Sequence, residues 1–172
     1  MSFNLPGHLQ QHRGNRAEAD REFASAKKIW TELATARGAA AEHRYHLAGL
    51  LANCPTVELR DWEQAQRLAQ SLTAEVADNA AYWNCLGAAS YRGGDWATAS
   101  KALEHAAELR TDDPRDWLFL ALNRWRAGEQ AKAREAFQRG SRAFSEHVPG
   151  SLEVRRLHQE AAELLGEKAV PK

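Results

Sequence analysis

Hydrophobic and small residues in the second half of the chain recur at a spacing of 34 positions. The matched pairs are Trp83 and Trp117, Leu86 and Leu120, Gly87 and Ala121, Tyr91 and Trp125, Gly94 and Gly128, Ala99 and Ala133, and Leu103 and Phe137. A fixed period of this length indicates a repeated helix-turn-helix unit, because each unit buries its apolar face only by stacking on its neighbours. The pattern therefore predicts a stack of helix pairs.

The same spacing extends toward the N-terminus with gaps. Asp61, Trp62 and Ala65 stand 34 positions before Asp95, Trp96 and Ala99, and a weaker unit begins near Phe3. We predict one domain over residues 1-166, made of units at about 1-38, 39-78, 80-113 and 114-147. A helix with one apolar stripe over 151-165 is typical of the cap that covers the last repeat. We expect residues 167-172 to be a flexible tail.

Small residues recur where the two helices of a unit meet. Gly49, Gly87 and Ala121 take this place in the first helices, and Ala19, Ala65, Ala99 and Ala133 take it in the second. Because larger side chains would hold the helix axes apart, we expect close contact at these positions. Alanine makes up about a fifth of the chain, an excess typical of packed helices, so the predicted fold class is all-α.

The order aromatic, Leu, small, aromatic, Gly, Ala, large apolar resembles the tetratricopeptide repeat (TPR) family. That resemblance implies a right-handed α-solenoid of about four units plus a C-terminal capping helix. It also implies a protein-protein interaction module or scaffold that binds a peptide or partner protein in its concave groove.

The segment from Tyr45 to Ala65, with its LANCP element, is similar to the TPR region of planctomycete multidomain proteins that carry kinase or WD40 modules. This narrower likeness implies a bacterial protein that is a terminal interaction segment or a stand-alone relative of one. It carries over no catalytic residue.

The concave face of such a solenoid is lined by first-helix residues that point away from the second helix. We predict that the partner-binding groove comprises Asn84, Tyr91, Arg92, Arg115, Leu118, Leu122, Trp125 and Arg126. Arginine and aromatic residues dominate binding hot spots, which favours a partner that is acidic or has an aromatic anchor. Tyr91 and Trp125 could equally pack between first helices as core.

A TPR subclass grips the acidic C-terminal peptides of heat-shock chaperones through Lys, Asn and Arg residues on successive first helices. Of the corresponding positions in the last three units, which include His46, Leu50 and Cys85, only Arg115 has suitable chemistry. We therefore predict that the chain does not bind chaperone tails in this way.

Two pairs of histidines one helical turn apart, His8 with His12 and His43 with His46, form a low-probability metal-site hypothesis. Solvated histidines are the favoured interpretation, so we predict neither a metal nor a cofactor. Ser90, Ser100 and Cys85 lack a paired general base in the sequence, and we predict no enzymatic activity.

Lys+Arg 23 and Asp+Glu 23 give a formal net charge of zero, which argues against nucleic acid as a partner. No stretch is apolar enough to span a membrane, no export signal is visible, and two cysteines are too few for a disulfide framework. These features favour a cytoplasmic protein. The alternative function is a structural one, self-association or assembly without a discrete peptide ligand, and a homo-oligomer stays open.

Overall fold

Helices account for nearly all of the described chain, which in this computed structural model comprises residues 16–110, 112–147 and 151–168. The α-helices are α2 (Arg16–Thr35), α3 (Ala41–Asn53), α4 (Trp62–Glu75), α5 (Ala80–Gly93), α6 (Trp96–Leu109), α7 (Pro114–Arg126), α8 (Gln130–His147) and α9 (Leu152–Leu165). No strand occurs within these residues, so the all-α prediction is confirmed. Nor is any helix among them long and apolar enough to cross a membrane.

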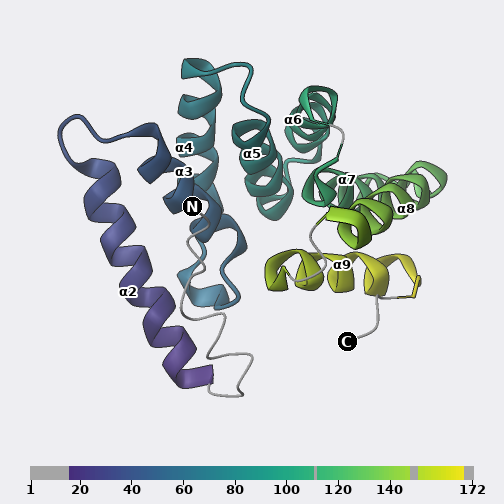
Figure 1. Cartoon of the computed structure of the whole chain (residues 1–172), viewed down its shortest axis with the longest axis horizontal. Helices are drawn as coiled ribbons and strands as arrows, with labels where there is room; N and C mark the ends of the chain where they lie inside the picture. Colours follow the sequence, from purple (N-terminus) through teal and green to yellow (C-terminus); the bar gives the residue numbers. More distant parts are fainter. Residues whose placement is uncertain (1–15, 111, 148–150, 169–172) are drawn as a thin grey trace.

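Successive helices pack antiparallel and form pairs: α3 with α4, α5 with α6, and α7 with α8. The first helices of these pairs also contact one another, and α9 continues that row by packing against α7. Figure 1 shows the resulting arc, with α2 at one end and α8 at the other. The predicted first helix of the first unit lies outside the described residues, and the predicted unit boundaries remain predictions.

Helix ends follow local rules that the sequence carries. Asp61 and Asp95 each begin a second helix, where their carboxylates accept hydrogen bonds from the backbone N–H groups of Gln64 (2.9 Å) and Thr98 (3.1 Å). Gly94 and Gly128 follow first helices with φ of 83° and 81°. Glycine adopts this left-handed conformation without a steric penalty, which explains its recurrence after 34 residues.

The alanines predicted at the helix-pair contacts, Ala19, Ala65, Ala99 and Ala133, have no exposed surface. The glycines predicted at the matching place in the first helices differ from one another. A Cβ atom added at Gly87 would lie 2.4 Å from Leu103 Cγ, whereas one added at Gly49 would meet nothing within 4 Å. The expected close approach therefore holds at Gly87 and is wrong at Gly49, where the paired helices leave room.

The connection between α3 and α4 contains a short 3-10 helix at Val57–Leu59. Its start is attached to α2 by a hydrogen bond from the Thr56 hydroxyl to the Asp20 carboxylate. Its end is attached by Lys27, whose Nζ donates to the Leu59 carbonyl at 3.0 Å. The long helix α2 is thus fastened to the next unit by polar contacts as well as by apolar packing.

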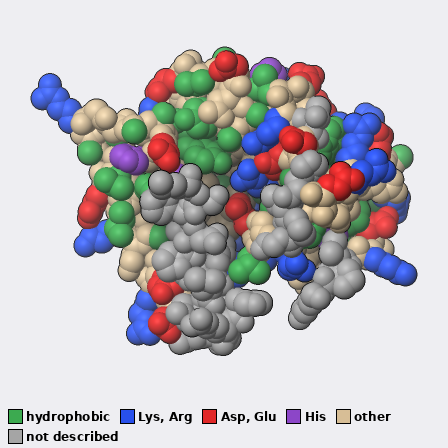
Figure 2. All heavy atoms as spheres, viewed as in Figure 1, with side chains coloured by type: hydrophobic (Ala, Val, Ile, Leu, Met, Phe, Trp, Pro, Cys, Tyr) green, Lys and Arg blue, Asp and Glu red, His purple; other side chains and the backbone are tan. Residues whose placement is uncertain are grey.

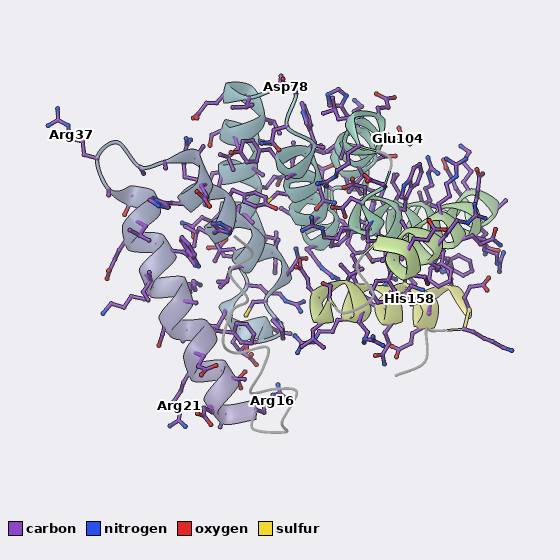
Figure 3. All side chains as sticks on the ribbon, viewed as in Figure 1. Arg16, Arg21, Arg37, Asp78, Glu104 and His158 are labelled. Atoms are coloured by element: carbon purple, nitrogen blue, oxygen red, sulfur yellow. The ribbon has the colours of Figure 1, made fainter. Side chains whose placement is uncertain are left out.

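Helix α9 is anchored by a buried histidine, His158, which Figure 3 labels on this helix. Its Nε2 lies 2.8 Å from the Ser141 hydroxyl, and its ring packs 4.8 Å from that of Phe137 and 5.8 Å from that of Phe144. Burial lowers the pKa of His158, with the charge of Arg155 acting in the same direction. The neutral imidazole is therefore part of the α8–α9 packing.

Candidate partner-binding face

The first helices α3, α5 and α7 lie side by side, so their side chains meet across helix boundaries. Asn84 of α5 donates from Nδ2 to Oδ1 of Asp116 in α7 at 2.6 Å, and Asp116 has no exposed surface. Burial, together with the charge of Asp113, raises the pKa of Asp116 to about 7, although Arg110 acts against it. Asn84 is therefore part of an internal polar network.

Arg115 is engaged at the start of α7. Its Nη2 donates to the Asp113 carboxylate at 2.7 Å, and Arg110 reaches the same carboxylate at 2.9 Å. Burial alone would raise the pKa of Asp113, but hydrogen bonding and charge from Arg115 outweigh it and lower that pKa. Arg115 keeps 29% of its side-chain surface exposed, so a partner can reach it only at the edge of this ion pair.

The two predicted groove aromatics differ in burial. Tyr91 is only 6% exposed, with its ring 6.0 Å from that of Phe119 and 5.6 Å from that of Trp96, so it belongs to the core. Trp125 is half-buried, and the guanidinium of Arg134 from α8 lies 5.2 Å from its ring centroid. Of these two aromatics, Trp125 is the one that keeps part of its surface exposed.

Leu118 and Leu122 were expected in the groove, but both have no exposed surface. Leu118 packs toward α8, because a Cβ added at Gly140 would lie 2.9 Å from its Cγ. The physical reason is that α7 contacts α5, α6, α8 and α9, which leaves few of its faces open. In this conformation, these two leucines stabilise the core and cannot contact a partner.

Arg92 and Arg126 bring charge to the C-terminal ends of the first helices. Arg92 forms a two-pronged ion pair with Glu160 of α9, in which Nη2 and Oε2 are 2.6 Å apart, while Arg126 is exposed. Figure 2 shows basic and acidic side chains next to one another in the middle of this face. The accessible part of the predicted groove is therefore Arg92, Arg115, Trp125 and Arg126.

Sequence reasoning missed Glu160 and Arg60, which belong to this face although neither lies in a first helix. Arg60 follows the 3-10 helix, and Glu160 is 68 residues from its partner Arg92. The separation of 68 residues is twice the 34-residue period, so Glu160 stands at the repeat position of Arg92 and Arg126. The period could have placed Glu160 on this face if 151–165 had been aligned as a first helix and not only as a cap. Arg60 lies outside the first helices, where the period marks no groove position.

The histidine hypothesis can be followed only in part, since His8 and His12 lie outside the described residues. His43 and His46 of α3 both lie against Trp30 of α2, with ring centroids 6.1 Å and 4.7 Å from it. Within the described ranges, no group of three or more His, Cys, Asp or Glu side chains is placed to hold a metal ion.

Two of the three residues considered as nucleophiles, Ser90 and Cys85, are buried, whereas the Ser100 hydroxyl donates to Glu104 at 3.3 Å on the exposed side of α6. Ser90 has no exposed surface, and its hydroxyl accepts from Gln66 Nε2 at 3.2 Å. Burial raises the pKa of the Cys85 thiol to about 12, which disfavours the reactive thiolate.

An open groove of about 1010 Å³ lies on another side of the molecule, between α6 and α8. Its floor includes Trp117 and Leu120 of α7, and Arg139 of α8 lies with its guanidinium 4.9 Å from the Trp117 ring centroid. Arg124 spans the groove floor to reach Glu104 at 3.2 Å. The sequence analysis did not anticipate this groove.

Comparisons with known proteins identify the fold. No protein-family model matches the chain, and no curated protein matches it in sequence. The similar crystal structures include the translocator chaperone SycD of the Yersinia enterocolitica type III secretion system, the MamA protein, and the TPR domain of Sgt2 from Aspergillus fumigatus. Each is 20% identical to this chain.

SycD matches with a TM-score of 0.58 over 73% of this chain and 89% of its own. MamA matches with a TM-score of 0.58 over 93% and 79%, and the Sgt2 domain with 0.54 over 74% and 85%. The chain therefore has a TPR-type fold, and the prediction of a right-handed α-solenoid with a capping helix is confirmed.

Proposed function

We propose that the chain is a protein-protein interaction module that holds a peptide or partner protein on the face formed by its first helices. One observation carries the proposal: Arg126, at the end of α7, is exposed and hydrogen-bonds to Tyr91, whose ring centroid lies 5.4 Å from the Arg92 guanidinium, and the neighbouring Trp125 is half-buried. Aromatic and arginine side chains supply most of the binding energy at protein interfaces. The similar structures include a domain described as TPR and a protein described as a chaperone, which supports the same class of function.

The proposal includes several finer features of the sequence analysis. The partner is protein, not nucleic acid or membrane; the chain is non-enzymatic, bacterial and cytoplasmic; and it is related to the TPR region of planctomycete multidomain proteins. The net charge of zero and the buried, internally bonded Ser90 support the first two features.

The test is partner recovery from a lysate of the source organism by the tagged protein and two charge-reversal variants. Arg126→Glu places a negative charge on the proposed face. Arg37→Glu makes the same change at the far end of α2, where Figure 3 shows Arg37 pointing away from the molecule. We expect Arg126→Glu to lose partners that wild type and Arg37→Glu retain, at unchanged melting temperature. Equal recovery by all three proteins would exclude this face.

Self-association is the second candidate, and exposed apolar residues on α2 favour it. Ile29 is 53% exposed and Leu33 is 38% exposed, one helical turn apart. Light scattering distinguishes this function, because a self-associating chain has a mass that is a multiple of 19.2 kDa. In that case Ile29→Glu should restore the monomer.

A further inference from the structure

Arg92 is held by a single carboxylate in a largely enclosed position. Its side chain is 17% exposed, it forms the two-pronged pair with Glu160, and its Nε is buried without a hydrogen-bond partner. The guanidinium also lies 5.4 Å from the ring centroid of Tyr91 and 5.6 Å from that of Phe119. Burial acts to lower the pKa of Arg92, but hydrogen bonding to Glu160 outweighs it and raises the pKa.

Two further arginines lie near this pair. Arg60 is fixed by a hydrogen bond from its Nε to the Cys54 carbonyl at 2.7 Å. Burial lowers its pKa, the positive charge of Arg92 lowers it further, and Glu160 opposes both. Arg126 hydrogen-bonds to the Tyr91 side chain and so acts against the burial that raises the pKa of Tyr91. Arg60, Arg92 and Arg126 thus form one group, which we call the arginine cluster.

The arginine cluster has more positive charge than the carboxylate beside it can balance. Glu160 pairs with Arg92, whereas no carboxylate of the described residues forms an ion pair with Arg60 or Arg126. Asp20 acts on the pKa of Cys54, as Arg60 does, but its carboxylate is engaged by Thr56 and by Arg16. Because arginine stays charged, a half-buried Arg60 and an exposed Arg126, neither with a carboxylate, are a favourable place for an anionic group from outside.

We propose that the arginine cluster docks an acidic segment of the partner protein, and that Glu160 occupies Arg92 in the free chain until such a segment competes for it. The proposal rests on the proposed function and names the chemistry of its partner. Glu160 itself supplies the precedent, since it shows that this position accepts a carboxylate with two parallel hydrogen bonds.

An acidic protein segment fits better than nucleic acid. The other end of the same face carries Asp113 and Asp116, and Glu153 lies close enough to act on the pKa of Arg115 and Tyr45. The two arginines at that end, Arg110 and Arg115, are already paired with Asp113, and Glu153 is exposed. A long polyanion that extends along the face would therefore find no unbalanced positive charge there, whereas a short run of Asp or Glu can contact the arginine cluster alone.

The test measures binding of a fluorescein-labelled peptide of six glutamates to the full-length protein by fluorescence anisotropy at about 50 mM salt. Glu160→Gln frees Arg92, and we expect it to bind the peptide about five- to tenfold more tightly than wild type. The matched control is Glu163→Gln, which removes the same charge from an exposed site on α9, where Glu163 accepts from Gln159 at 2.9 Å. This control should bind like wild type.

Arg60→Gln provides an independent measurement that leaves α9 intact. We expect it to weaken peptide binding about three- to tenfold, and Arg37→Gln to leave it unchanged. Thermal melts of every variant show whether it is folded, and a Glu160→Gln protein that unfolds leaves the Arg60→Gln result to decide.

Three results would overturn the inference: equal binding by wild type and Arg60→Gln, binding no tighter than that of a neutral Gly-Ser peptide, or tighter cluster-dependent binding of single-stranded DNA. If lysate partners still depend on Arg126 while the peptide results fail, the proposed function stands and only the acidic docking site is wrong. If peptide binding follows the expected pattern while no partner depends on Arg126, the acidic docking site stands and the proposed partner-binding role of the Arg126 face is wrong.

Discussion

Two glycines at the same repeat position should respond in opposite ways to the same substitution. At Gly87 an added Cβ would lie 2.4 Å and 2.7 Å from Cγ and Cδ2 of Leu103, which has no exposed surface and therefore cannot turn away into solvent. Forcing an extra methyl group into a packed interior costs about 1–3 kcal/mol. Alanine recovers about 0.5–1 kcal/mol of helix stability relative to glycine. Because an approach of 2.4 Å places the packing cost in the upper half of its range, Gly87→Ala should destabilise the protein by about 1–2.5 kcal/mol.

At Gly49 only the gain in stability from replacing a helical glycine by alanine remains, because nothing lies within 4 Å of an added Cβ. Gly49→Ala should stabilise the protein by about 0.4–1 kcal/mol, chiefly by restricting the unfolded chain. For a chain of this size, 1 kcal/mol shifts the melting temperature by about 2–4 °C. We expect a fall of about 2–10 °C for Gly87→Ala and a rise of about 1–4 °C for Gly49→Ala.

Thermal and urea unfolding followed by far-UV circular dichroism measure both effects. The two variants control for each other, since each adds one methyl group to a first helix at the matching repeat position. A Gly87→Ala protein as stable as wild type would refute the described contact with Leu103. A destabilised Gly49→Ala protein would refute the open space beside α3.

Two other outcomes follow from burial. The raised pKa of Asp116 keeps a proton on the folded protein between its ordinary value of 3.8 and about 7, so this residue's contribution to stability falls as pH rises through that window. Asp116→Asn should therefore gain stability relative to wild type as pH rises from 4 to 7, by up to about 1.4 kcal/mol per pH unit. Urea titrations at several pH values measure this, and a difference in unfolding free energy between the two proteins that does not change with pH would contradict it. Cys54 and Cys85 are buried, and burial raises the pKa of both thiols. Ellman's reagent at pH 8 should therefore label both cysteines in guanidinium and neither quickly in the native protein. Fast labelling of the native protein would show that the packing is looser than described.

The parts of the fold that depend on neighbouring residues could be predicted from the sequence. Gly94 and Gly128 end first helices because positive φ is a local requirement, and Ala99 and Ala133 are buried because adjacent helices meet there. The contrast between Gly49 and Gly87 shows the limit of this reasoning. Matching repeat positions share a sequence role, but the separation of the paired helices differs from unit to unit, and no periodicity records it.

Which residues of the candidate site are exposed depends on contacts between helices of different units. The sequence placed Leu118 and Leu122 in the groove because it assigned them to the open side of a first helix, yet α7 is enclosed by helices before and after it. The burial of α7 comes from α5 and α6 on one side and from α8 and α9 on the other, and the residue pattern within α7 alone does not record these contacts. Arg126, at the end of α7, stayed exposed because the enclosing helices do not cover it.

Helix α9 explains why Glu160 faces the arginine cluster. Its apolar stripe, with Leu157 and Ala161, is buried, and α9 packs against α7 and α8 in the place that the first helix of a further repeat would take. Its polar side therefore lies on the same face as the first-helix residues and brings Glu160 to Arg92. A capping helix needs only an apolar stripe to cover the last repeat, so a carboxylate paired with α5 is an additional property of this chain. In the docking proposed above, this carboxylate is the group that an acidic segment displaces from Arg92, and the attraction is local because the net charge of the whole chain is zero.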